Sequence, residues 1–393
     1  MTPIIPTSPE IEAYRQQFPG LANKVYFNFG GQGTMSRSAL DKIIQSYEYI
    51  QNNGPFCLSV NQWIDEKIAL LRSHLAAELN ATADSIAITE NVTTGCNIAL
   101  WGIEWQKGDR ILITDCEHPG VVATVNEISR RFQVEVDICP MMATLNDGDP
   151  VKVISKCLQA KTRLVVVSHV LWNTGQILPI AEIADICHNY SSNLQVLVDA
   201  AQSVGALPLN LPQSGVDFYA FTGHKWLCGP AGVGGFYVSQ NALKTIAPTF
   251  IGIRGIYKDK KGVPIGWKED GRRFEISTSA FPLFSGLIEA IAVRNSWGNS
   301  EECYQQICRL SKYLWEELGS IEQINCLKKS PPENGLVFFT AENIANNKLV
   351  LALEKEGFML RTLADPDCIR ACVHYFTLPA EIDRLIATIK KLV

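Results

Sequence analysis

Two stretches of sequence decide the fold: LQVLVDAAQSVG at residues 194–205 and DFYAFTGHKW at residues 217–226. Each opens with a run of apolar residues and then changes to small and polar residues. Apolar runs of this length are typical of strands in a parallel sheet that is buried on both faces. Asp199 ends the first run, and Lys225 follows shortly after the second.

A lysine combined with a buried carboxylate is the arrangement that pyridoxal phosphate requires. The aldehyde of this cofactor needs an amine for a Schiff base, and its pyridine nitrogen must keep a proton, which a nearby carboxylate enforces. We therefore interpret Lys225 as the Schiff-base lysine and general base, and Asp199 as the partner of the ring nitrogen. Taken singly, an aspartate or a lysine after a strand is more often a turn residue, so the surrounding motifs matter.

Similar apolar runs recur from about residue 85 to 240 and predict a doubly wound α/β domain. The expected strands cover residues 111–114, 164–170, 194–198, 218–221 and 235–238. An earlier helix is predicted because apolar residues spaced by three and four share one face. These residues are Ile64, Ile68, Leu71, Leu75 and Leu79. After about residue 285, a helix, two strands and a final helix predict a smaller α+β domain.

The composition, 47% hydrophobic and 19% charged over 393 residues, is that of an ordinary globular protein. This length exceeds what one hydrophobic core normally fills, so we expect two domains. A net charge of −5 without a basic stripe argues against nucleic acid as a partner. We expect a cytoplasmic protein, because a signal sequence and a membrane span are both lacking. The twelve cysteines form no CxxC pair, so we expect reduced thiols and no metal.

The two stretches, together with GPAGVGG at residues 229–235, resemble the class V aminotransferase superfamily, which includes cysteine desulfurases and the cyanobacterial cystine C-S lyase. The resemblance covers most of the chain. It implies the fold-type I architecture of pyridoxal phosphate dependent transferases, with a mainly parallel sheet of the seven-stranded type in a large α/β domain and a small α+β domain. We assign residues 21–284 to the large domain, and residues 1–20 with 285–393 to the small one.

The resemblance also implies which residues hold the cofactor phosphate. TENVTTG at residues 89–95 is similar to the family's phosphate cup, where a helix start and the hydroxyl of Thr93 hold the dianion. Asn91 and Val92 stand where the family usually has Gly-Ala, so the detailed geometry of the cup stays open. Thr222 and His224, both in TGHK, match further family positions at the phosphate.

Other positions match residues around the cofactor ring and across a subunit interface. His118, in CEHPG, would stack on the pyridine ring, and Gln202 would hydrogen-bond the phenolic oxygen. Thr278, in RRFEISTSA, would reach the phosphate of a second subunit, which implies an obligate homodimer. Trp172 stands where desulfurases have an asparagine and Asn173 follows it, so which of the two lines the pocket stays open.

The segment GFMLRTLADPDCIRAC, at residues 357–372, carries two arginines that match family positions near the substrate carboxylate. A guanidinium forms two parallel charge-assisted bonds to a carboxylate, so we expect Arg370 to bind the α-carboxylate and Arg361 to assist. In desulfurases these arginines flank a much longer loop with a nucleophilic cysteine. Here they are nine residues apart (370 minus 361), and Pro366 falls at the cysteine position. The nearest thiol in sequence, Cys368, shares the strand face of Arg370 and stays a candidate.

Without that loop, the chemistry of the family leads to β-elimination, which gives pyruvate and ammonia and releases sulfide from cysteine or a persulfide from cystine. A persulfide is the more acidic leaving group, which favours cystine. The first hypothesis is therefore a dimeric C-S lyase. A cysteine desulfurase that passes sulfur to a scaffold protein through Cys368, and a non-catalytic interaction module, are the alternatives. An iron–sulfur apoprotein is one candidate sulfur acceptor, and the identity of the acceptor stays open.

Overall fold

The computed structural model describes residues 9–393, and its central element is a seven-stranded sheet with the order β2-β8-β7-β6-β5-β3-β4. Within this sheet only β8 runs against the other strands. The predicted α/β fold with a mainly parallel sheet is confirmed. The strands are β2 (Ile86–Thr89), β3 (Arg110–Thr114), β4 (Glu135–Cys139), β5 (Thr162–Ser168), β6 (Gln195–Asp199), β7 (Phe218–Thr222) and β8 (Gly234–Val238).

Helices cover both faces of this sheet, because its strands carry apolar side chains on both sides. Along β6, Val196 and Val198 belong to one core cluster and Leu197 to another. The first cluster includes residues of α3 and α7, and the second includes residues of α4 and α5. The helices are α3 (Leu58–Glu78), α4 (Val92–Gly102), α5 (Pro119–Phe132), α6 (Pro150–Cys157), α7 (Ile180–Tyr190) and α8 (Leu211–Ser214).

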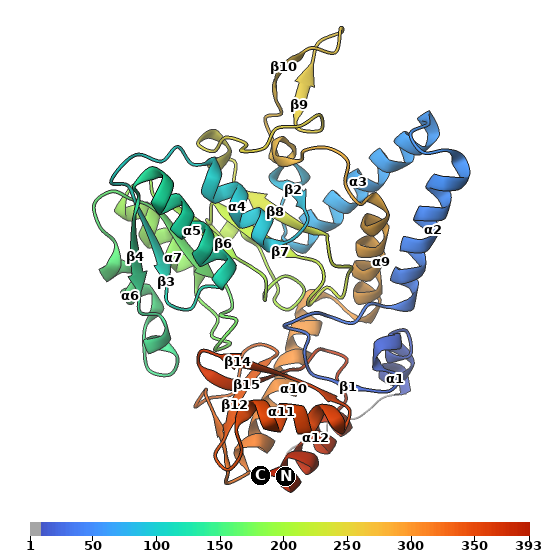
Figure 1. Cartoon of the computed structure of the whole chain (residues 1–393), viewed down its shortest axis with the longest axis vertical. Coiled ribbons are helices and arrows are strands. Elements are labelled where there is room, and N and C mark those ends of the chain that lie inside the picture. Colours follow the sequence, from blue (N-terminus) through green and yellow to red (C-terminus); the bar gives the residue numbers. More distant parts are fainter. Residues whose placement is uncertain (1–8) are drawn as a thin grey trace.

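Two features extend from the body of the molecule (Figure 1). The long helices α2 (Arg37–Asn53) and α3 pack on α9 (Phe281–Trp297) and meet at an outlying turn. A hairpin of β9 (Ile256–Lys258) and β10 (Pro264–Trp267) projects beyond the end of the sheet, and most of its side chains are exposed. This hairpin is absent from the sequence prediction.

A second sheet, of four antiparallel strands in the order β11-β12-β15-β14, forms the other layer of the molecule. Its strands are β11 (Ile324–Cys326), β12 (Leu336–Ala341), β14 (Arg361–Ala364) and β15 (Asp367–Cys372). The helices beside it are α10 (Ser300–Gly319), α11 (Asn346–Lys355) and α12 (Pro379–Leu392). The expected helix, two strands and final helix correspond to α10, β12, β15 and α12, whereas α11, β11 and β14 are absent from the sequence prediction.

The N-terminal segment connects the part of the molecule built on the seven-stranded sheet with the part built on the four-stranded sheet. After α1 (Pro9–Arg15), strand β1 (Val25–Tyr26) pairs in parallel with β13 (Phe358–Met359), and Val25 and Phe27 belong to the core of the small sheet. The division into residues 21–284 and residues 1–20 with 285–393 stays a prediction, and residues 1–8 lie outside the described part. From residue 9 onward, no helix combines the length and apolar character needed to cross a membrane.

Candidate active site

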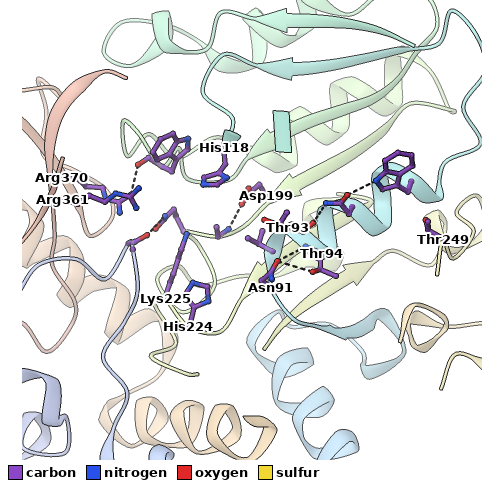
Figure 2. A pocket seen from close by; sticks show the side chains of 18 of the residues that line it. Asn91, Thr93, Thr94, His118, Asp199, His224, Lys225, Thr249, Arg361 and Arg370 are labelled. Carbon is purple, nitrogen blue, oxygen red and sulfur yellow. Dashed lines mark hydrogen bonds between the residues drawn. The ribbon is translucent and has the colours of Figure 1, made fainter. Parts of the chain in front are cut away.

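A cavity of about 1010 Å³ lies at the carboxyl ends of the parallel strands, between the two sheets (Figure 2). Asp199 ends β6, His118 follows β3, and Lys225 follows β7. Parallel strands bring such ends to one edge of a sheet, which is where open α/β sheets bind their ligands. Arg361 and Arg370 come to the same cavity from the small sheet. The structure therefore brings together residues that the sequence separates by up to about 250 positions.

Asp199 and Lys225 form the electrostatic centre of the cavity. The carboxyl of Asp199 is 5% exposed, and its Oδ1 accepts a hydrogen bond of 2.9 Å from the backbone N–H of Ala201. Burial raises the pKa of Asp199, although Lys225 and His118 act in the other direction. Burial also lowers the pKa of Lys225 to about 8. Its Nζ makes no hydrogen bond to any residue from 9 to 393, so this amine is free for covalent chemistry.

A glycine-rich segment before α2, FNFGGQG at residues 27–33, forms part of the cavity wall and was not among the predicted site residues. The carbonyl of Gly30 accepts a hydrogen bond of 2.9 Å from Nε2 of Gln202. Gly33 donates its N–H to the carbonyl of His224 at 2.7 Å. A Cβ on Gly33 would lie 2.2 Å from the carbonyl oxygen of Lys225, so only glycine allows this approach. The closely spaced glycines of this segment were the sequence feature that could have indicated its place in the cavity wall.

The start of α4 forms one end of the cavity, where the phosphate cup was expected. Asn91 is the N-cap of this helix, and its Oδ1 accepts a hydrogen bond of 3.0 Å from the backbone N–H of Thr94. This capping role accounts for the asparagine that departs from the family pattern. Thr93 and the first turn of α4 line the cavity, which gives a helix N-terminus suited to an anion.

Two further residues predicted at the phosphate are linked to each other, one at the end of β7 and one just after it. The hydroxyl of Thr222 lies 2.5 Å from Nδ1 of His224. His224 lines the cavity, whereas Thr222 is 2% exposed and lies behind it. Burial lowers the pKa of His224. Thr222 is therefore placed to orient the imidazole, and only His224 faces the cavity directly.

His118 and Trp172 form another part of the wall. His118 is the N-cap of α5, and its Nδ1 accepts a hydrogen bond of 3.2 Å from the backbone N–H of Gly120. Its ring meets that of Trp172 edge-on, with 5.6 Å between the centroids. Trp172 lines the cavity and Asn173 does not, because the Asn173 side chain is 3% exposed and turns toward the carbonyl of Asp365. Of the two candidates, Trp172 is therefore the residue that lines the pocket.

Gln202 is held at both ends of its amide. Nε2 donates to the carbonyl of Gly30, and Oε1 accepts a hydrogen bond of 3.0 Å from the indole Nε1 of Trp226. The Oε1 contact fixes which end of the amide is the donor. One N–H of the amide stays available to an oxygen in the cavity, as the predicted role requires.

The two arginines lie directly opposite each other in the β14–β15 hairpin. Arg370 is 1% exposed, and its Nη1 donates to the carbonyl of Trp172 at 3.2 Å. Its Nε and Nη2 are buried and have no partner among residues 9–393. Buried donors without partners are rare in folded proteins. These two donors of one planar group fit a carboxylate. Arg361 is exposed on the edge strand and lines the same cavity.

Cys368 does not reach the cavity, because it is fully buried in the core and burial raises its pKa to about 12. Cys368 does share the strand face of Arg370, but the expectation that it could reach the cavity is wrong. Cys372, two residues after Arg370, is also fully buried, and burial raises the pKa of its thiol. Among the described residues, no cysteine lines the cavity.

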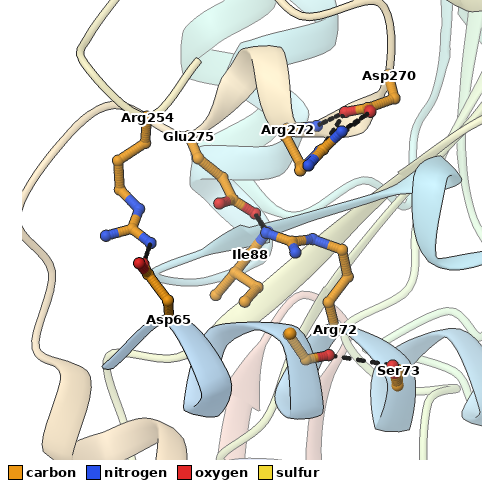
Figure 3. Close-up of polar contacts among 9 residues, drawn as sticks. Asp65, Arg72, Ser73, Ile88, Arg254, Asp270, Arg272 and Glu275 are labelled. Carbon is orange, nitrogen blue, oxygen red and sulfur yellow. Dashed lines mark hydrogen bonds and ion pairs between the residues drawn. The ribbon is translucent and has the colours of Figure 1, made fainter. Parts of the chain in front are cut away.

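Thr278 is exposed and does not line this cavity. It borders a neighbouring cavity of about 270 Å³ that shares Thr94 and Thr249 with the first. The segment before Thr278 is anchored by Glu275, whose Oε1 accepts hydrogen bonds of 2.6 Å from Arg72 and 3.1 Å from the backbone N–H of Ile88 (Figure 3). The role of Thr278 across a subunit interface stays a prediction.

These residues fit pyridoxal phosphate. The cavity offers an unpaired amine, a buried carboxylate, a helix start for a phosphate, and unpaired guanidinium donors for a substrate carboxylate. Each part matches a different group of the cofactor and its amino-acid substrate.

Comparison with known proteins agrees with this fit. The family model for class-V aminotransferases matches residues 25–383. The solved complex of the cystine C-S lyase C-DES with its reaction product cysteine persulfide is 50% identical, with a TM-score of 0.93 over 95% of this chain and 99% of that chain. A C-DES mutant with glycine covalently linked to its pyridoxal phosphate is also 50% identical, with a TM-score of 0.94 over 96% of this chain and 98% of that one.

Curated relatives point to the same family. A probable cysteine desulfurase of Methanothermobacter thermautotrophicus is 26% identical over 409 residues, which cover 97% of this chain and 98% of the relative. The predicted cofactor and family are therefore confirmed. The chain belongs to the class-V aminotransferase family and is a pyridoxal phosphate dependent enzyme of the cysteine desulfurase and C-S lyase group.

Proposed function

We propose that this enzyme is a C-S lyase that cleaves L-cystine, and to a lesser extent L-cysteine, by β-elimination. The observation that carries the proposal is the β14–β15 hairpin, which places Arg361 and Arg370 side by side at the cavity and keeps Cys368 in the core. A desulfurase needs a reactive thiolate that can reach the substrate sulfur. The 50% identity to a cystine C-S lyase supports the same assignment.

The cofactor site would be built by the residues of the large sheet. Bound pyridoxal phosphate supplies an aldehyde that bonds to the substrate amine and a ring that takes up the electrons left at Cα. Asp199 would hold a proton at the ring nitrogen, and His118 would lie against the ring. Thr93 and His224, the latter oriented by Thr222, would hold the phosphate.

Substrate orientation would come from Arg370. Its Nε and Nη2 form one edge of a planar fork, and a carboxylate that binds both would stay in one orientation. Arg361, directly opposite, adds positive charge on the exposed side. Together with Gln202, which would bind the cofactor's phenolic oxygen, these side chains would fix the substrate relative to Lys225.

Lys225 would move the proton at Cα. Its lowered pKa of about 8 leaves a substantial neutral fraction of the amine near neutral pH, and a neutral amine is a general base. After the α-proton leaves, the bond between Cβ and sulfur breaks and cysteine persulfide departs with the electron pair. The remaining aminoacrylate takes up one water and gives pyruvate and ammonia. Cystine and one water thus balance pyruvate, ammonia and cysteine persulfide.

A product assay tests this proposal. The holoenzyme is incubated with cystine, cysteine and a set of other β-substituted amino acids, and pyruvate, ammonia, alanine and sulfane sulfur are measured. The expected result is pyruvate and sulfane sulfur from cystine in equal amounts. Alanine as the main carbon product would instead identify a desulfurase, the activity named for the curated relatives.

We also propose a homodimer in which Thr278 contributes to the partner's phosphate site. Residues around Thr278 leave large apolar side chains in solvent, as expected of an interface that one chain alone leaves uncovered. These are Phe250 (69% exposed), Ile251 (55%), Ile253 (53%) and Ile276 (45%). Sedimentation of the holoenzyme would give the mass of two chains.

The persulfide that the proposed reaction releases would serve an acceptor such as an iron–sulfur apoprotein in the cytoplasm.

A further inference from the structure

Glu117 is a buried carboxyl to which the proposed function gives no role. It directly precedes His118 and is 6% exposed. Its Oε1 accepts hydrogen bonds of 2.6 Å from the hydroxyl of Thr114 and 3.1 Å from the backbone N–H of Ser168, and its Oε2 accepts one of 2.7 Å from the hydroxyl of Ser168. Three donors satisfy this carboxylate, so its contacts are internal to the protein.

These hydrogen bonds join the ends of two strands beside the cofactor site. Thr114 ends β3 and Ser168 ends β5, and Ser168 lies directly opposite Asp199 in the β5–β6 pair. The turn between β3 and α5 carries His118 into the cavity. Glu117 therefore fastens this turn to the strand end next to Asp199.

The imidazole of His118 has few anchors of its own. Its Nδ1 accepts a long hydrogen bond of 3.2 Å from Gly120, and its Nε2 bonds to no residue from 9 to 393. The edge-on contact with Trp172 restrains only one side of the ring. The place of the ring in the cavity thus depends on the backbone of the turn.

We propose that Glu117 is a positioning residue for the reaction, because its carboxylate holds the β3–α5 turn and so sets where His118 lies relative to Asp199 and Lys225. Functional side chains must stay within about 0.5 Å of their productive position, which requires supporting contacts of this kind. The proposal rests on the proposed function only for the statement that His118 contacts the cofactor ring.

Burial decides the charge of Glu117 and hence the conditions of the test. It raises the pKa of this carboxyl to about 7, and the nearby charge of Asp199 adds to the effect, whereas Thr114 and Ser168 oppose it. The nearby thiols of Cys96 and Cys116 have raised pKa values and stay neutral. At pH 8 most of the Glu117 carboxyl is ionised and accepts all three hydrogen bonds, so we choose that pH.

The test compares two substitutions in the holoenzyme. Glu117→Ala leaves three buried donors without an acceptor, whereas Glu117→Gln keeps the length of the side chain and can bond the same neighbours. We expect Glu117→Ala to lower kcat by about 100-fold, the usual cost of a 1 Å misplacement, with less than a threefold change in KM. The visible circular dichroism of the bound cofactor should fall by at least half. Glu117→Gln should recover most of both.

Glu78→Ala is the matched control. It removes a buried carboxylate that pairs with Arg294 at 2.7 Å and does not line the cavity. It should lower the melting temperature as Glu117→Ala does, with kcat and circular dichroism unchanged. The positioning role is wrong if the two alanine variants behave alike in every measurement, or if Glu117→Gln fails as badly as Glu117→Ala.

A milder variant covers the case in which Glu117→Ala does not fold. Ser168→Ala removes one of the three hydrogen-bond donors and should change kcat and circular dichroism in the same direction, by a smaller factor. Values equal to those of the wild type would overturn the proposal. Circular dichroism of the bound cofactor is measured without substrate, so it tests Glu117 even if cystine is not the substrate.

Discussion

Arg370→Lys tests the binding of the substrate carboxylate. The substitution keeps the positive charge, which matters because the charge of Arg370 contributes to the lowered pKa of Lys225. It removes the planar fork whose Nε and Nη2 have no protein partner. A point charge forms one strong bond where the fork forms two.

The loss follows from the strength of one charge-assisted hydrogen bond in a buried site. Such a bond contributes about 1.5–3 kcal/mol, which corresponds to about a 10- to 150-fold loss in kcat/KM. Because the proposed mechanism assigns the proton transfer to Lys225 and not to Arg370, most of the loss should appear in KM. Pyruvate formation from cystine, coupled to lactate dehydrogenase, measures both constants.

A matched variant separates this effect from the general cost of shortening a buried arginine. Arg294→Lys changes an arginine that is 4% exposed and paired with Glu78 away from the cavity, and it should leave KM within a factor of two. If Arg370→Lys also leaves KM within threefold of the wild type while the cofactor stays bound, the substrate carboxylate binds elsewhere and the reasoning is refuted.

Four further outcomes are expected. The purified protein should be yellow with a visible band that borohydride abolishes, and Lys225→Ala should lose the covalent link and nearly all turnover; an active alanine variant would exclude Lys225 as the base. Asp199→Asn should slow turnover by about 10²- to 10³-fold, the effect of losing about 3–4 kcal/mol of electrostatic stabilisation, and near-normal rates would make Asp199 structural only. Cys368→Ser should leave pyruvate formation from cystine largely intact, whereas a folded, yellow but inactive variant would restore the desulfurase alternative. Because burial lowers the pKa of Lys225 to about 8 and only the neutral amine attacks an aldehyde, cofactor uptake by the apoenzyme should speed up as pH rises through 8 and then level off; a rise that continues to pH 10 would contradict this.

The sequence predicts the buried strands well, because strands covered on both faces are continuous apolar runs. The runs at residues 194–198 and 218–221 correspond to β6 and β7 within one residue. Other strands are missing from the expected set. β2 is apolar and largely buried, yet it is not among the expected strands. β4 is an edge strand with mixed exposure, and the β9–β10 hairpin is mostly exposed, so neither shows an apolar pattern.

The site is predictable where it follows directly from a strand and unpredictable where it depends on distant segments. Asp199 and Lys225 lie at or just after the ends of apolar runs, and these runs predict the strands that position them. The contact between Gln202 and Gly30 spans 172 positions, and no local pattern indicates it. Likewise, alternation along a strand places Cys368 on the face of Arg370, but only the packing of the small sheet shows that this face is closed around the thiol.

The facing arginines of the β14–β15 hairpin predict that the stability of the protein depends on its ligand. Like charges directly opposite each other weaken an antiparallel pair, and Arg361 and Arg370 are such a pair. A bound carboxylate relieves this repulsion, so occupancy of the site and folding of the small sheet are linked by mass action. Substrate depletion would then expose the enzyme to unfolding and proteolysis first at this hairpin, and supply of substrate would protect it. If these two charges bind an anionic substrate as proposed, they would also couple the lifetime of the enzyme to the amount of that substrate.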